Sequence, residues 1–222
     1  MTHSYSHILF DLDGTLTDPK LGITSAIQYA LSKFSIEIDN LDVLDPFIGP
    51  PLAGSFKEFY GFTDDQCSQA ITYYREYFAK RGMYENVRYE GIKELLAALK
   101  ELGANLFVAT SKPTFFAEKI ISHFEMSEYF DFIGGSNLDN TRVDKGEVIE
   151  HVMQTCGIAS EDAIMIGDRK HDIIGAKRHG MDSIGVGYGY GSEEELRLAE
   201  PTYLAGTVEE LGKLLAGLVK NN

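Results

Sequence analysis

Two aspartates separated by one residue, Asp11 and Asp13, follow the short apolar run at residues 8–10. Alternate residues of an extended chain face the same side, so both carboxylates can point into one pocket. Hard oxygen donors at this spacing suit Mg²⁺, and one carboxylate can act as a nucleophile while the other acts as a general acid and then as a base. Gly14 lets the chain turn tightly after them. Acidic turns are also common at the ends of ordinary strands, so this pair does not establish a site by itself.

A second acidic pair, Asp168 and Asp172, follows the apolar run at residues 163–166. Asp168 can complete a metal shell, and Asp172 can hold a metal-bound water or orient Lys145. The competing interpretation is that these acids lie at a helix N-terminus and complement the helix dipole. Because a metal site needs carboxylates from separate segments, the two acidic pairs support each other.

Thr110 ends another apolar run, residues 106–109, and Lys145 begins a predicted helix. The Thr110 hydroxyl and the backbone amide of Ser111 can hold phosphate oxygens. If Lys145 points inward, its ammonium can neutralise a phosphate and fix Asp11. A threonine at this position is more often a helix cap and a lysine is usually exposed, so both interpretations stay open at this point.

The apolar runs alternate with helical stretches from residue 86 onward. Continuous apolar strands in alternation with helices predict a parallel sheet covered on both faces. Further strands are predicted at residues 130–133 and, as the last one, at 183–186. Ligands of such sheets bind beyond the carboxyl ends of the strands, where the candidate residues lie.

Residues 17–82 are predicted to be all-helical. Ile23, Ile27 and Leu31 keep one face of a helix apolar, and Thr63 with Gln66 forms a capping box. Because this segment directly follows the first strand, it would lie above the strand ends as a lid. We therefore predict an α/β core made of residues 1–16 and 83–222, with a small helical cap domain at residues 17–82 inserted after the first strand.

The chain has 222 residues and a formal net charge of -14. An acidic surface repels nucleic acids and anionic membranes, so we expect neither as a partner. No apolar stretch is long enough to span a bilayer, and the N-terminus lacks the pattern of a signal peptide. Cys67 and Cys156 are expected to be free thiols in a reducing cytoplasm. We expect a cytoplasmic monomer or homodimer.

Four pieces of the sequence resemble the ordered motifs of the haloacid dehalogenase superfamily: DLDGT at 11–15, TSKP at 110–113, Lys145, and GDRKHD at 167–172. The helical insert resembles the cap of the phosphoglycolate phosphatase-like branch. The resemblance implies a Rossmann-like parallel sheet core and a Mg²⁺-dependent phosphatase. Such an enzyme hydrolyses small phosphorylated metabolites through an aspartyl-phosphate intermediate.

The resemblance also implies a role for each motif residue. The expected roles are nucleophile and metal ligand for Asp11, general acid/base and metal ligand through its backbone carbonyl for Asp13, phosphate binding for Thr110, charge stabilisation for Lys145, metal ligation for Asp168, and support of the metal for Asp172.

Several rival functions fit the sequence less well. Dehalogenating relatives typically lack the acid at position 13, and relatives of β-phosphoglucomutase carry a histidine early in the cap, which residues 18–22 do not contain. A phospho-receiver domain, which is phosphorylated as a switch without turnover, has no helical cap and no acid two residues after its phosphorylated aspartate. A binding protein without catalysis would be expected to have lost a motif residue.

The identity of the substrate is predicted less directly. The loop at residues 47–51 resembles the cap loop that reaches toward the active site in phosphoglycolate phosphatase relatives, which makes Gly49 and Pro50 candidates for substrate contact. The same residues also suit an ordinary connection between helices. We expect a phosphoglycolate phosphatase-like activity, and the alternative is a 5′-nucleotidase acting on nucleoside monophosphates. The glycine-rich residues 187–191 lack the spacing of a dinucleotide fingerprint and are predicted to form a loop near the site.

Overall fold

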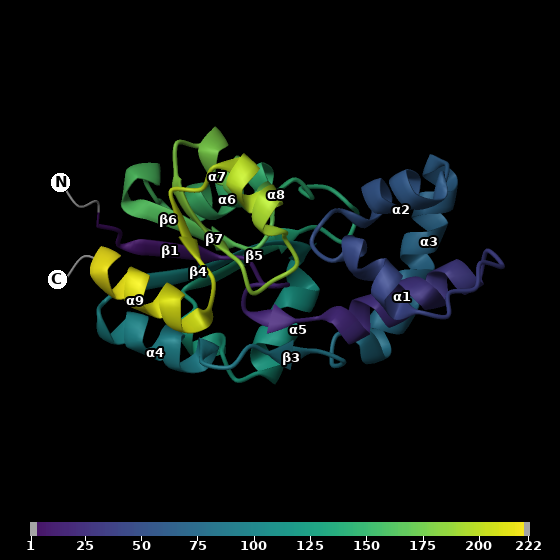
Figure 1. Ribbon diagram of the computed structural model, residues 1–222, viewed down its shortest axis with the longest axis horizontal. Coiled ribbons are helices and arrows are strands. Elements are labelled where there is room, and N and C mark those ends of the chain that lie inside the picture. Colours follow the sequence, from purple (N-terminus) through teal and green to yellow (C-terminus); the bar gives the residue numbers. More distant parts are fainter. Residues whose placement is uncertain (1–3, 220–222) are drawn as a thin grey trace. The chain divides into compact units, whose positions relative to one another are not determined.

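The computed structural model describes residues 4–219, and its contacts divide the chain into two compact units (Figure 1). The smaller unit is Asp18–Val87. The larger unit combines the segment before Asp18 with the segment after Val87. That the smaller unit acts as a cap over the site stays a prediction.

A parallel six-stranded sheet forms the centre of the larger unit. Every neighbouring pair of its strands is parallel, which confirms the predicted α/β fold. The strands lie in the order β5 (Phe132–Ser136), β4 (Asn105–Pro113), β1 (His7–Phe10), β6 (Ala163–Gly167), β7 (Asp182–Val186) and β8 (Tyr203–Ala205).

Helices cover both faces of this sheet, as Figure 1 shows. One face carries α6 (Lys145–Cys156), α7 (Lys170–Arg178) and α8 (Glu193–Ala199). The other carries α4 (Ile92–Glu101), α5 (Thr114–His123) and α9 (Val208–Leu218). Under α6, Val148 and Val152 pack with Leu9 and Met165 of the sheet in one buried cluster. Burial on both faces explains why the strands read as continuous apolar runs.

The register of the central strands determines where the motif residues emerge. Phe10 at the end of β1 is aligned with Val108 of β4 on one side and with Ile166 of β6 on the other. Asp11 and Asp168 therefore follow β1 and β6, and Thr110 lies within β4 at nearly the same level. The sheet itself brings residues that are far apart in the sequence to one edge.

Two strand predictions were wrong in detail. The strand predicted at residues 130–133 is β5, Phe132–Ser136. The strand at residues 183–186 is not the last one, because β8 pairs with β7 at the edge of the sheet. At three residues, β8 is too short to show a periodic pattern in the sequence.

The smaller unit is helical, as predicted for this part of the chain. Its elements are α1 (Lys20–Ser32), η1 (Leu41–Phe47), α2 (Leu52–Tyr60), α3 (Asp64–Tyr77) and the π-helical turn η2 (Phe78–Gly82). The predicted capping box of Thr63 and Gln66 is present at the start of α3. Aromatic rings fill much of the interior, and Phe56 and Phe62 stack with their centroids 5.6 Å apart. Two short strands, β2 (Thr17–Asp18) and β3 (Val87–Arg88), pair where the chain enters and leaves this unit.

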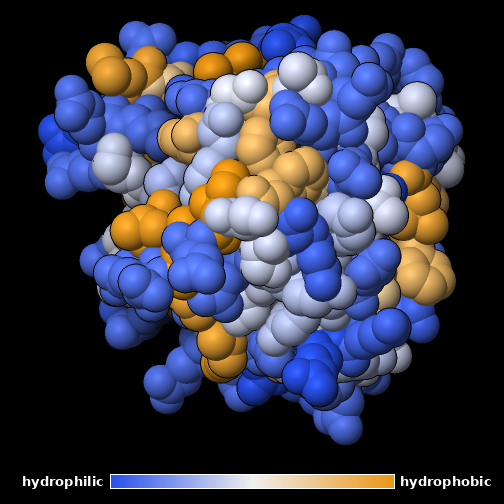
Figure 2. Space-filling model, turned by 90° about the vertical axis from the view of Figure 1, so that its right-hand side faces the viewer, coloured by the Kyte–Doolittle hydropathy of each residue, from blue (hydrophilic) through white to orange (hydrophobic). Residues whose placement is uncertain are grey.

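The surface is mainly hydrophilic on the face drawn in Figure 2, where hydrophobic residues form small, separate groups. Within residues 4–219, no helix combines the length and the apolar character that a membrane span requires. Cys67 and Cys156 are both free thiols, as the sequence predicts.

Backbone packing inside the smaller unit depends on two glycines that face each other, Gly22 of α1 and Gly82 of η2. A Cβ atom added at Gly22 would lie 1.9 Å from the carbonyl oxygen of Gly82. Because the obstacle is backbone, a side chain at this position cannot be accommodated by a change of rotamer.

We expect Gly22→Ala to lower the free energy of unfolding by about 1–3 kcal/mol, the usual cost of overpacking. The matched control is Gly54→Ala in α2, where an added Cβ meets no atom within 4 Å. Alanine in an open helix interior should raise stability by about 0.5–1 kcal/mol. Urea unfolding followed by circular dichroism measures both. Equal midpoints for the Gly22 variant and the wild type would contradict the close contact.

Candidate active site

Asp11 is the first residue beyond β1, and its position is fixed at both the backbone and the side chain. Its backbone N–H donates to the carbonyl oxygen of Ile166, 2.8 Å away. Its carboxylate is almost fully buried, and Oδ1 accepts a hydrogen bond from the Leu12 backbone N–H at 2.7 Å. The Lys145 ammonium lies 2.8 Å from the same oxygen. Both contacts therefore act on Oδ1, and neither of them holds Oδ2 of Asp11.

Lys145 is the first residue of α6, directly after the N-cap Asp144, and its side chain is buried. Its Nζ lies 2.8 Å from Oδ1 of Asp11, 2.8 Å from Oδ1 of Asp172 and 3.0 Å from the carbonyl oxygen of Ala109. An ammonium has three donors, and three oxygens surround it here. Burial by itself would lower the pKa of Lys145, but the charges of Asp11 and Asp172 raise it above its usual value. Lys145 is therefore a permanent positive charge in the site.

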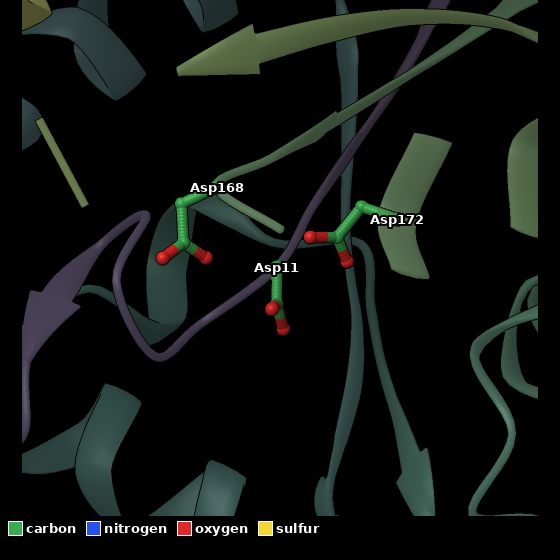
Figure 3. Close-up of side chains that lie close together, drawn as sticks. All are labelled: Asp11, Asp168 and Asp172. Carbon is green, nitrogen blue, oxygen red and sulfur yellow. The ribbon is translucent and has the colours of Figure 1, made fainter. Parts of the chain in front are cut away.

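Three buried carboxylates, Asp11, Asp168 and Asp172, form an acidic cluster (Figure 3). Each offers one oxygen, and these oxygens all lie within 4.8 Å of one another. Asp168 Oδ1 is buried and accepts no hydrogen bond from any residue of the described chain, 4–219. A set of carboxylate oxygens with one left unsatisfied fits a Mg²⁺ ion, which prefers hard oxygen ligands.

Two carboxyl groups of this cluster, Asp168 and Asp172, have raised pKa values. Burial raises the pKa of Asp168 well above its usual value, and the neighbouring charges of Asp172 and Asp11 raise it further. Burial likewise raises the pKa of Asp172 to about 6, against the opposing effect of Lys145. A bound divalent cation would offset this repulsion and favour the ionised carboxylates.

The glycine-rich loop at residues 187–191 holds Asp168 in place. The Tyr190 backbone N–H donates to Asp168 Oδ2 at 2.7 Å, and the Tyr188 hydroxyl donates to the carbonyl oxygen of Thr15 at 3.0 Å. A Cβ atom on Gly189 would lie 2.4 Å from both the Asp168 Cβ and the Gly14 carbonyl oxygen. Close packing against the site therefore requires a glycine at position 189. The sequence analysis predicted a loop near the site here but assigned no role to it.

Asp13 has a different partner from Asp11. Its Oδ2 lies 2.5 Å from the Nζ of Lys112, and both side chains are buried. Burial raises the pKa of Asp13, and Lys112 opposes that shift. The side chain of Asp13 is not one of the three carboxylates of the acidic cluster. The sequence analysis missed Lys112, although its alternation with Thr110 along a strand was a signal that both could face the site.

The predicted phosphate-binding residues lie at the end of β4. Thr110 is buried, and its Oγ1 accepts a hydrogen bond from the Lys112 backbone N–H at 3.2 Å. Ser111 is partly exposed. Gly49 and Pro50 belong to the smaller unit, between η1 and α2, so their contact with substrate stays a prediction.

A buried aspartate with one oxygen held by a lysine, beside a cluster of carboxylates at the carboxyl edge of a parallel sheet, fits a protein of the phosphoryl-transfer class. The sequence profile of the haloacid dehalogenase-like hydrolases matches residues 8–186. The chain belongs to this family, as its motifs predict.

Relatives with known names include phosphatases and a protein kinase. A 5′-nucleotidase of Pseudomonas aeruginosa is 49% identical over 95% of this chain and 96% of its own length. The tyrosine-protein kinase PtkA of Mycobacterium tuberculosis is 35% identical over 94% of this chain and 72% of its own. Phosphoglycolate phosphatase 1 of P. aeruginosa is 28% identical over 92% of this chain and 77% of its own.

Among solved structures, a crystal structure from Clostridium acetobutylicum, described as a predicted phosphatase, is similar with a TM-score of 0.95 and 49% identity. The similarity covers 97% of this chain and all of the other. The predicted family, fold and enzyme class are confirmed: this is a phosphatase of the haloacid dehalogenase type.

The raised pKa values of the buried carboxyl groups predict how the stability of the protein changes with pH. A carboxyl whose pKa is higher in the folded than in the unfolded state binds more protons when folded, so stability falls as the pH rises between the two values. For Asp172 that window runs from the usual 3.8 to about 6. We expect thermal melts of the metal-free protein to show decreasing stability across this window. Added Mg²⁺ should raise the melting temperature more at about pH 7 than at about pH 5, because the ion needs ionised ligands.

The matched variant for this measurement is Asp168→Asn, which removes one buried carboxyl from the cluster. Its melting temperature should depend less on pH and respond less to Mg²⁺ than that of the wild type. An unchanged pH slope in this variant would show that the cluster does not cause the effect.

Proposed function

We propose that Asp11 attacks the phosphorus of a small phosphate monoester and carries the phosphoryl group during turnover. The observation that supports this role is that both contacts to its carboxylate act on the same oxygen. Oδ1 is fixed by the Leu12 amide and the Lys145 ammonium, so Oδ2 is the oxygen oriented for attack. Holding a nucleophile in one orientation lowers the barrier of a displacement.

Lys145 and two residues near the end of β4 bind the phosphoryl group while it is transferred. The Lys145 ammonium keeps Asp11 in place and offsets negative charge on the phosphoryl oxygens, where preorganised charge is most effective. The Thr110 hydroxyl and the Ser111 amide bind those oxygens. Burial of Lys145 and Thr110 excludes water and strengthens these interactions.

Asp13 transfers the protons. In the first step it gives a proton to the oxygen of the departing alcohol, and in the second it removes a proton from the water that hydrolyses the aspartyl-phosphate. The raised pKa of Asp13 favours the protonated form that the first step needs.

Asp11, Asp168 and the backbone carbonyl of Asp13 would hold Mg²⁺, with Asp172 in support. When bound, the ion supplies positive charge that stabilises the phosphoryl oxygens. The acidic cluster at the site supports this assignment, because its oxygens have the chemistry and the proximity that such an ion requires.

For the substrate, we propose nucleoside 5′-monophosphates, with phosphoglycolate as the second candidate. The 5′-nucleotidase relative is 49% identical over nearly the full length of both chains, whereas the phosphoglycolate phosphatase relative is 28% identical. Comparison of kcat/KM for the two kinds of ester decides between them. A higher value for phosphoglycolate would reverse this order.

Removal of the nucleophile tests the proposed reaction. We expect Asp11→Asn to lower phosphate release by at least about a thousandfold in the presence of Mg²⁺, because the amide cannot form the covalent intermediate. Asp65→Asn, an exposed position in α3, is the control and should keep wild-type activity. Turnover by the Asp11 variant at the wild-type rate would sink the proposal. Stable phosphorylation of wild-type Asp11 without turnover would favour a receiver-like switch.

Replacement of the central lysine tests its double role. Lys145→Met keeps the length of the side chain but leaves Asp11 and Asp172 buried without their cation. Breaking a buried ion pair from one side costs about 3–5 kcal/mol, so we expect a large loss of stability at neutral pH together with loss of activity. Lowering the pH toward about 5 should restore part of the stability, because protonation of Asp172 removes one of the uncompensated charges. Calorimetry at two pH values measures this, and an identical loss at both would contradict it.

A further inference from the structure

We propose that Lys112 is a positioning residue for Asp13: it holds one carboxylate oxygen so that the other faces the departing alcohol. This inference rests on the proposed function, since it assigns a residue to the proton-transfer half of the same reaction. Lys112 acts through Asp13 and not directly on the phosphoryl group.

The contact itself is asymmetric. The Lys112 Nζ lies 2.5 Å from Oδ2 of Asp13, and the two side chains are only 5% and 10% exposed. The other oxygen, Oδ1, is also buried, and no donor within residues 4–219 reaches it. A buried acceptor without a partner is costly, so a polar atom of the substrate would be favoured at this oxygen. The departing oxygen of the ester is the atom that must meet Asp13 there.

The backbone around Lys112 is built to hold this orientation. The pairing of β4 with β5 shifts register between Thr110 and Pro113, so the strand is irregular at Lys112. The Lys112 backbone N–H donates to Thr110 Oγ1 at 3.2 Å. On the other side, a Cβ atom on Gly135 would lie 2.3 Å from the Lys112 carbonyl oxygen. Such irregularities re-aim side chains at the ends of strands.

The two buried lysines therefore form ion pairs with different carboxylates of the site. Lys145 lies against Asp11 and Asp172, and Lys112 lies against Asp13. This division has a kinetic consequence. Removal of Lys112 should impair protonation of the departing alcohol and leave attack by Asp11 on phosphorus largely intact.

The test compares two esters in wild type and Lys112→Met. A nucleoside 5′-monophosphate releases an alkoxide that must be protonated, whereas para-nitrophenyl phosphate releases a stable phenolate that needs little help. Because kcat/KM reports the steps up to release of the alcohol, we expect a loss of at least about a hundredfold for the alkyl ester, within the usual range for a general acid. For the aryl ester the loss should be less than about tenfold.

Two further variants make the result specific. Asp13→Asn should show the same selective loss, and the double variant should lose no more than Asp13→Asn alone, because both residues act as one unit. With the aryl ester, both single variants should give a burst of phenolate equal to the enzyme concentration, followed by slow turnover. The burst follows because the second step also needs Asp13.

Equal losses for both esters in Lys112→Met would overturn the proposal, and so would no loss for either. If Lys112→Met does not fold, Lys112→Ala, which also removes the donor to Asp13, is judged by the same ratio. Failure of the proposed function looks different: the wild type itself would then hydrolyse neither ester. Selective loss in the Asp13 variant without selective loss in the Lys112 variant refutes only the role of Lys112.

Discussion

The buried ammonium of Lys145 is the constraint on which the active site depends. A charge this far from water must be surrounded by acceptors, and here Asp11, Asp172 and the Ala109 carbonyl supply them. These acceptors come from the ends of β1 and β4 and from α7, so one side chain ties three segments together. The helix that carries Lys145 begins at this residue, with Asp144 capping the first turn. The orientation of Asp11, the proposed nucleophile, thus follows from the need to satisfy a buried cation.

The same electrostatic logic explains how a strongly acidic protein can bind an anion. The net charge of -14 repels phosphate esters at long range. Lys145 and Lys112 place two positive charges inside the site, each next to a carboxylate. The acidic cluster would attract a divalent cation, whose charge would offset the remaining negative charge of the carboxylates. Charge at the site is therefore set by local pairs, independently of the surface.

Much of this arrangement could be predicted from the sequence because parallel strands end at one edge. Asp11, Thr110 and Asp168 each follow an apolar run, and the register of β1 with its neighbours brings them to the same level. What escaped prediction depends on contacts without a local pattern. The edge strand β8 has three residues and forms only because β7 offers it a partner. The alternation of Lys112 with Thr110 indicates only that both can face the same side, and the folded chain is needed to show that its partner is Asp13.

The pairing of β2 with β3 has a consequence for how this kind of protein diversifies. The chain leaves the sheet-bearing unit at one short strand and returns at the other, so the two ends of the helical segment are neighbours. A segment with adjacent ends can be exchanged for another of different length without changing the register of the sheet or the order of its strands. Selection can therefore act on the helical segment as an interchangeable module, while the carboxylates and lysines of the sheet edge keep their chemistry.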